Sequence, residues 1–220
     1  TDGFFLLARK PVEKFDWSML KGKEVIGFRP GSNPIVFLET ALRKHGLDPQ
    51  KDVKLLNNIG IPARAGAWMA GQGEYGIFLE PEAGELVRNG KGYIVASVGH
   101  EVGQVDYTVF TATDKYIRDN PKVIQAWTNV VARAEKYVKD TPAATLAPQI
   151  MSYFPGMDAA AVTDAIERYK QYQIWKTTPL VTAEAMNQLQ DMLVASAVMK
   201  DGARVKYEDV VVADFARKVP

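Results

Sequence analysis

The sequence predicts an α/β protein, and three observations lead to this fold class. Four short apolar segments alternate with helical patterns between residues 20 and 98, which indicates βαβ units and a parallel or mixed sheet. After Gly99, one more strand-like stretch is followed by helical patterns almost to the end of the chain. The 220 residues, 47% hydrophobic and 24% charged, are typical of a soluble globular protein large enough to bury a core.

The first strand is expected at Phe4–Ala8, and the α/β unit follows it. The helices of this unit each open at a proline, which is favoured in the first helical turn. The predicted strands are Glu24–Phe28, Val53–Leu56, Gly76–Leu79 and Tyr93–Val98, and the predicted helices are Pro34–His45, Pro62–Ala70 and Pro81–Val87.

Beyond the α/β unit we expect a strand at Asp106–Ala112 and then helices. This strand and Phe4–Ala8 enclose the unit, which suggests one lobe inserted into another and joined by two crossing strands. We therefore predict lobe two at 17–102, and lobe one at 1–10 together with 103–220. The later helices are expected at Pro121–Val138, Ala143–Ser152, Ala159–Tyr172 and Ala183–Met199, with a short helix near the end.

Charge and composition exclude several classes of protein. The formal net charge is +1, from 27 basic and 26 acidic residues, so no general attraction to nucleic acid or to an anionic membrane is expected. No run of about 18 apolar residues predicts a transmembrane helix. The absence of cysteine excludes disulfides, thiolate metal sites and a cysteine nucleophile. The opening TDGFFLLARK has neither a basic region nor a long apolar region, so no signal peptide is predicted in this chain.

The stretch RPGSNP, from Arg29 to Pro34, lies between a predicted strand and a predicted helix. Such a loop faces the carboxyl edge of the sheet, where α/β proteins bind ligands, and the free N–H groups of the helix attract anionic or polar groups. Gly31 allows close backbone approach, while Ser32 and Asn33 offer a hydroxyl and an amide. Arg29 would reinforce an anion site, or it is simply solvated. The residues leave open the alternative that Asn33 only caps its own helix.

A second candidate lies in GIFLEPEAG, where Glu80 and Pro81 stand between a strand and a helix. A carboxylate here would favour a cationic or hydroxyl-bearing ligand group, or it would cap the helix. The two histidines are far apart and have no metal-ligand spacing, so neither a metal nor a cofactor is expected. No known catalytic motif occurs. Trp175, in the irregular QIWKTTP, is the tryptophan least easily explained as a core residue.

Five long stretches together resemble the nitrate/sulfonate/taurine type of ABC-transporter substrate-binding protein. This wider grouping includes proteins that bind thiamine-pyrimidine precursors. The similarity follows the same order over almost the whole chain, so it is more specific than any single motif. The stretches are DWSMLKGKEVIGFRPGSNPIVFLETALRKHGLDPQKDVKLLN, AGQGEYGIFLEPEA, YTVFTATDKYIRDNPKVIQAW, YFPGMDAAAVTDAIERYKQYQIW and VKYEDVVVADFA.

The resemblance implies a type II periplasmic-binding-protein fold, with two lobes, a two-strand hinge, a helical C-terminal half and a ligand in the cleft. The loops matching Gly31–Asn33 and Phe78–Pro81 would line that cleft, with Glu80 and the backbone at Phe78 on the lobe-two wall. Tyr107, at a crossing, would contact the ligand or act only in the hinge. Family members carry a further βαβα portion before the segment matching Gly3–Arg9, and this sequence lacks it.

From the resemblance we expect an extracytoplasmic solute-binding component of an ABC importer rather than an enzyme. It would be a monomer, periplasmic or attached to the outer face of a membrane, that captures a small anionic or polar organic solute and presents it to a membrane permease. Two alternatives stay open. One is an enzyme on the same fold, similar to thiamine-pyrimidine synthases or small-acid dehydratases. The other is the ligand-sensing domain of a transcriptional regulator.

Overall fold

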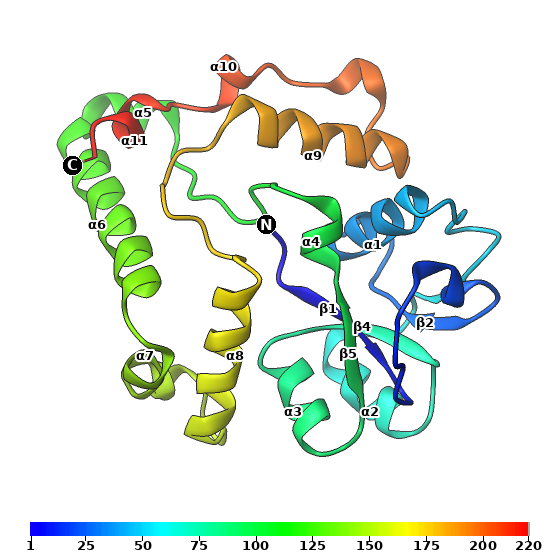
Figure 1. Cartoon of the computed structure of the whole chain (residues 1–220). Helices are drawn as coiled ribbons and strands as arrows, with labels where there is room; N and C mark the ends of the chain where they lie inside the picture. The colour runs from blue at the N-terminus through cyan, green and yellow to red at the C-terminus, as the bar shows by residue number, and fades with distance from the viewer. Residues whose placement is uncertain (220) are drawn as a thin grey trace.

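The computed structural model describes residues 1–219 and contains one five-stranded sheet with helices on both faces (Figure 1). The strand order is β3-β2-β4-β1-β5. β2 is parallel to β3 and β4, whereas β1 is antiparallel to both of its neighbours, β4 and β5. All five strands lie within two residues of their predicted ends: β1 (Phe4–Ala8), β2 (Glu24–Ile26), β3 (Lys54–Leu56), β4 (Tyr75–Leu79) and β5 (Tyr93–Ser97).

β1 comes first in the chain but occupies an interior position of the sheet. Its residues are all buried, because alternate side chains enter hydrophobic clusters on opposite faces: Phe4 and Leu6 on one, Phe5 and Leu7 on the other. The sequence-based division assigns residues 1–10 to lobe one, whereas this strand pairs on both sides with strands of the 17–102 unit. The division into 17–102 and 1–10 with 103–220 stays a prediction.

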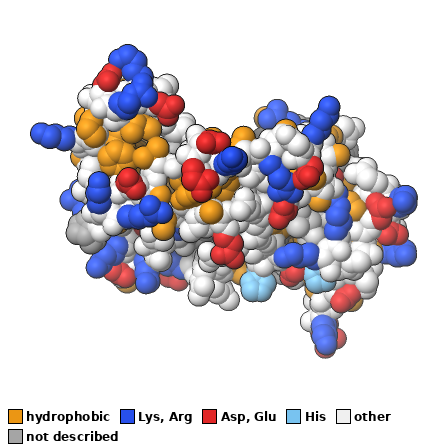
Figure 2. Space-filling view, turned by 90° about the horizontal axis from the view of Figure 1, so that it is seen from above, with side chains coloured by type: hydrophobic (Ala, Val, Ile, Leu, Met, Phe, Trp, Pro, Cys, Tyr) orange, Lys and Arg blue, Asp and Glu red, His pale blue; other side chains and the backbone are white. Residues whose placement is uncertain are grey.

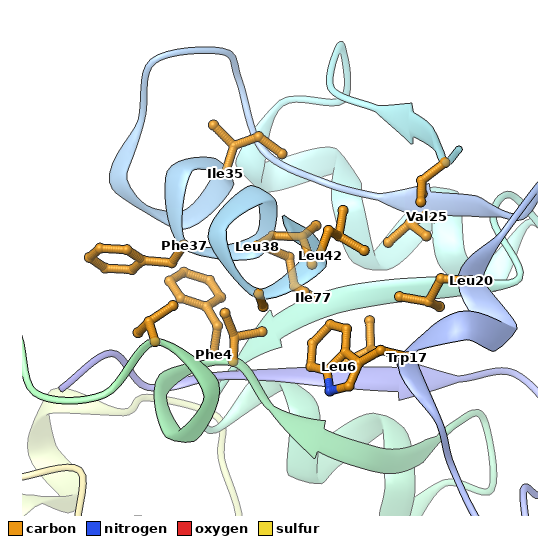
Figure 3. Packing of buried hydrophobic residues seen from close by; sticks show 14 of the residues in the cluster. Phe4, Leu6, Trp17, Leu20, Val25, Ile35, Phe37, Leu38, Leu42 and Ile77 are labelled. Carbon is orange, nitrogen blue, oxygen red and sulfur yellow. The ribbon is translucent and has the colours of Figure 1, made fainter. Parts of the chain in front are cut away.

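The helices on the two faces build two hydrophobic clusters. On one face α1 packs over β1 and β4, and Figure 3 shows Leu38 and Leu42 of α1 near Ile77, with Phe37 near Phe4. On the other face α2, α3 and α8 cover Phe5 and Phe78. These helices are α1 (Asn33–Lys44), α2 (Arg64–Met69), α3 (Glu82–Arg88), α4 (Val98–Val102), α8 (Ala159–Gln171) and α9 (Ala183–Ala195), with short 3-10 turns at Trp17–Leu20 and Ile61–Ala63.

The remaining helices stand to one side of the sheet (Figure 1). The apolar stripe of α6 predicts this helix correctly, but no α6 side chain is buried in the described structure, and Trp127 is half exposed. Figure 2 shows hydrophobic side chains gathered at the end of the molecule that α5, α6 and α11 form. The bounds are α5 (Asp114–Asp119), α6 (Pro121–Asp140), α7 (Ala143–Ile150), α10 (Tyr207–Val210) and α11 (Asp214–Arg217), with short 3-10 turns at Met151–Tyr153 and Asp201–Ala203.

The strand expected at Asp106–Ala112 is wrong. Residues 103–113 form neither helix nor strand, and Phe110 is 72% exposed. A strand is stable only where its N–H and C=O groups pair with a neighbouring strand, and this segment pairs with none of the five described strands. The crossing from the sheet to α5 is therefore irregular. Among the helices of the described range, none combines the length and apolar composition needed to cross a bilayer.

The start of β1 is held by a close backbone contact, which gives a test of the fold. Gly99, in α4, is buried, and a Cβ at this position would overlap the carbonyl oxygen of Asp2. We expect Gly99→Ala to lower the free energy of unfolding by about 1–3 kcal/mol, because neither backbone segment can move aside easily. Urea denaturation measures the change. Gly202→Ala is the matched control, since open space surrounds Gly202; equal stability of the two variants would contradict the packing.

Candidate functional site

The carboxyl ends of β2 and β4 form the point at which the strand order of the sheet reverses. From β2 the chain crosses through α1 to β3 on one side, and it returns through α2 to β4 on the other side. Open α/β sheets bind ligands outside such a point. Because β1 is antiparallel, its first residue, Phe4, lies opposite Leu79 at this same edge. The edge therefore collects the loop after β2, the loop after β4 and the residues before β1.

The loop after β2 presents the first turn of α1 without a side-chain cap. Ser32, not Asn33, is the N-cap residue, and it makes no capping hydrogen bond. Instead the Ser32 hydroxyl donates to the Arg29 carbonyl oxygen at 2.7 Å. The alternative that Asn33 caps α1 is therefore wrong, because the helix already begins at Asn33. Gly31 has φ +76°, which explains the glycine through the turn itself, and Arg29 and Gly31 are exposed.

The loop after β4 uses its carboxylate within the protein. The Glu80 side chain is only 2% exposed. One oxygen accepts the Gly84 N–H at 3.0 Å and thereby caps the first turn of α3, and the other accepts from the Arg168 guanidinium of α8. Pro81 is the N-cap residue of α3, and the Phe78 ring points into the core against Trp68. Glu80 thus has the capping role that the sequence left open, and a contact of this loop with a ligand stays a prediction.

Tyr107 lies at the same edge, although its segment is irregular. Its ring contacts Phe4 and Phe37, with centroid distances of 6.4 and 5.9 Å, and it is 37% exposed. Burial, reinforced by the negative charge of Asp2, raises the pKa of the Tyr107 hydroxyl. The structure therefore places Tyr107 beside the start of β1, and its contact with a ligand stays a prediction.

Arg64 is a residue of this edge that sequence reasoning missed. Its guanidinium donates to the carbonyl oxygens of Gly27 and Ile77, and so joins the ends of β2 and β4. It stacks 3.8 Å from the Phe28 ring centre, is 1% exposed, and its Nε has no partner in the described structure. Burial lowers the pKa of Arg64 to about 10, so the group stays charged at neutral pH. An arginine in the Ala-rich stretch PARAGAWMA gives no sign of such burial.

Asp2 is the second residue that the sequence did not reveal. Its carboxyl is fully buried at the start of β1, where Oδ1 accepts the Phe4 N–H at 2.5 Å and Oδ2 has no partner among residues 1–219. Burial raises the pKa of Asp2 to about 7. The edge therefore holds a buried cation and a buried carboxyl group that is partly protonated near neutral pH.

Tyr169 joins α8 to this edge. Its hydroxyl donates to the Gly3 carbonyl oxygen and accepts the Glu80 N–H, each at 3.2 Å. Burial raises the pKa of Tyr169, so it stays a neutral hydrogen-bonding group. Across residues 1–219, no three His, Asp or Glu side chains lie together as a set of metal ligands. The arrangement is suited to binding: open amides, a buried guanidinium and fixed polar groups along one edge.

Comparison with known proteins agrees with this description. A family model described as the NMT1-like family matches residues 14–152. YtlA, a provisionally assigned binding protein of Bacillus subtilis (strain 168), is 36% identical over 219 residues. The match covers 100% of this chain but 65% of YtlA, so the chain spans just under two thirds of that relative.

Two solved structures show the fold. The periplasmic aliphatic sulphonate binding protein SsuA from Escherichia coli superimposes with a TM-score of 0.69 and 21% identity, over 89% of this chain and 60% of that chain. The desulfurization enzyme DszB superimposes with a TM-score of 0.58 and 14% identity, over 97% and 74% of the two chains. The likeness confirms the predicted fold class, that of type II periplasmic binding proteins. The same fold carries an enzyme as well as binding proteins.

The buried Asp2 carboxyl predicts a pH-dependent stability. Its folded pKa lies above the unfolded value of about 4, so the folded protein holds the extra proton between these values and loses stability as the pH rises from about 4 to about 7. Asp2→Asn keeps the acceptor for the Phe4 N–H but cannot ionise. Over this range we expect the variant to gain up to about 4 kcal/mol in free energy of unfolding relative to the wild type.

Urea denaturation at several pH values between about 4 and 8 measures this difference. Glu82 and Glu135, whose pKa values burial also raises, are the same in both proteins, so their contribution cancels in the comparison. Parallel pH dependences of the wild type and Asp2→Asn would contradict the burial of an ionisable group at this position.

Proposed function

The chain belongs to the NMT1-like family, and from this premise we propose that it is the solute-binding component of an ABC importer. Its ligand is a small organic solute with an anionic group, bound at the carboxyl edge of the sheet. The solute is passed to a permease in the membrane, and the protein works as a monomer on the outer side of that membrane. The names of YtlA and SsuA as binding proteins support this assignment.

The observation that carries the proposal is the absence of an internal acceptor at the start of α1. In the described structure no side chain caps the first turn, whose N–H groups form the positive end of the helix dipole. A negatively charged ligand group is the acceptor such a turn favours, because the dipole and the remaining N–H groups of the turn act on it together, although Pro34 contributes no N–H. Arg29, exposed three residues before the N-cap residue, adds a positive charge.

The buried guanidinium of Arg64 also favours a negatively charged ligand. Its guanidinium is buried beneath the loop after β2 and bonds to carbonyl oxygens. Burial lowers the pKa of Arg64, the negative charge of Glu82 raises it again in part, and burial raises the pKa of Glu82 itself. A buried charge interacts strongly across a medium of low dielectric constant, so an anion at the α1 turn would stabilise Arg64 and be stabilised by it. Asp2 does not cancel this attraction, since its pKa of about 7 leaves it partly neutral.

The enzyme alternative has its support from the fold alone. DszB shares the architecture, but fold does not determine function. The groups at the edge of this sheet are already used in hydrogen bonds or buried, as for Glu80 and Tyr169, and none is placed as a nucleophile beside a base. Binding is therefore the function that the geometry supports best.

The direct test compares a small alkanesulfonate with the uncharged sulfonamide of the same carbon skeleton. Titration calorimetry on the full chain should give measurable binding of the sulfonate, with the sulfonamide about tenfold weaker or worse because it lacks the charge. Equal affinities would show that charge does not select the ligand. No binding of a sulfonate, nitrate or carboxylate series by the protein would contradict the proposal.

Substitution of Arg29 gives a matched test of the loop. We expect Arg29→Gln to weaken sulfonate binding about three- to tenfold, because an exposed charge contributes about 1 kcal/mol, and to leave the melting temperature unchanged. Arg133→Gln, an exposed arginine on α6, should leave the affinity unchanged. Calorimetry at low salt measures the dissociation constant of the sulfonate for each variant. Identical constants for Arg29→Gln and Arg133→Gln would show that Arg29 does not contribute to binding.

A further inference from the structure

A cavity of about 440 Å³ lies between α6, α8 and the segment 173–177. In Figure 1, α6 and α8 stand side by side, and the connection from α8 to α9 runs along them. The volume falls within the range of about 300–1,000 Å³ that small-molecule pockets occupy. The lining residues belong to 104–177, so the cavity is separate from the loop at Arg29–Asn33.

One wall of this cavity is aromatic. Trp175 is 42% exposed although it lies in an irregular segment, and its ring stands perpendicular to Tyr169 with a centroid distance of 5.3 Å. Tyr169 is held in place by its hydrogen bonds to Gly3 and Glu80. The two rings therefore offer a preformed apolar surface, which explains the tryptophan that the sequence left without a core position.

Some charged side chains of the cavity are bonded to other groups of the protein, and others are not. The Lys170 ammonium donates to the carbonyl oxygens of Lys139 and Thr141. The Lys176 ammonium donates to Asp106 at 2.6 Å and to the Leu180 carbonyl oxygen. Both lysines are thus committed to the protein and leave little charge for a ligand.

Glu135 and Lys139 are the unused pair. They lie four residues apart on α6, a spacing at which opposite charges usually pair, yet they form no ion pair in the described structure. Glu135 Oε2 is buried without a partner, and so is Oδ2 of the neighbouring Asp106. Burial raises the pKa of Glu135. A buried acceptor without a donor is costly, and a ligand donor would remove that cost.

We propose that this cavity binds a small zwitterion that carries an ammonium group, an acidic group and a flat apolar body. The ammonium group donates to Glu135, the acidic group pairs with Lys139 at the rim, and the apolar body packs on Trp175 and Tyr169. A simple cation fits less well, because it leaves Lys139 at the rim without an anionic partner. A simple anion fits less well, because it leaves the buried oxygen of Glu135 without a donor.

The test uses three probes with the same ring and chain: phenylalanine, phenethylamine and 3-phenylpropanoate. Calorimetry on the full chain should show phenylalanine binding, with each singly charged probe about tenfold weaker because it loses one charge-assisted contact. Equal binding of the three probes, or no binding of phenylalanine up to about 10 mM, would overturn the proposal.

Variants separate a binding role from a structural one. Glu135→Gln should weaken phenylalanine about tenfold and leave 3-phenylpropanoate unchanged, since 3-phenylpropanoate has no ammonium group to donate to the carboxylate. Trp175→Ala should weaken all three probes. Glu167→Gln, an acid of α8 that lines a different cavity, is the matched control and should change nothing. A loss of 3-phenylpropanoate binding in Glu135→Gln equal to that of phenylalanine would contradict the assignment. Arg29→Gln should leave phenylalanine binding unchanged, which keeps this site distinct from the sulfonate test.

Discussion

The insertion of β1 between β4 and β5 is the contact on which the rest of the structure depends. Without β1, β5 would lose its neighbouring strand in the sheet, and β4 would lose one of its two. The two hydrophobic clusters would lose Phe4 and Phe5. Because β1 is antiparallel, it also carries Asp2 and Gly3 to the edge where the parallel strands end. The strand that completes the core therefore also supplies polar groups to the candidate site, and stability and binding share one element.

Two buried groups of opposite character lie at that edge. Arg64 keeps its charge because its donors reach the carbonyl oxygens at the ends of β2 and β4, and its face packs on Phe28. Asp2 has one oxygen without a partner, and burial shifts its equilibrium toward the neutral form. As Asp2 ionises with rising pH, it offsets more of the positive charge that Arg64 brings to the edge.

The sequence predicted the strands of the α/β unit well because local patterns determine them: short apolar runs end at glycine, proline or asparagine. Prediction from the sequence failed where the structure of a segment depends on the element packed beside it. Residues 106–112 have the composition of a strand, but in the described structure no strand lies beside them, and Phe110 remains exposed. The burial of Arg64 and Asp2 could not be predicted either. The Arg64 side chain depends on carbonyl groups distant in sequence, and Asp2 lies where α4 packs against its backbone at Gly99. By contrast, the helix after Arg29 and the odd position of Trp175 were visible in the sequence itself.

Tyr169 belongs both to the carboxyl edge of the sheet and to the cavity beside α6. Its hydroxyl bridges Gly3 and Glu80 at the edge of the sheet, and its ring forms a wall of the cavity with Trp175. Arg168, the preceding residue, pairs with the same Glu80 that caps α3. These contacts fix α8 against the sheet by hydrogen bonds as well as by the packing of Phe5 on Tyr169 and Tyr172. The position of α8, and with it the shape of the cavity, is therefore set by the loop after β4, so the two regions cannot be built independently.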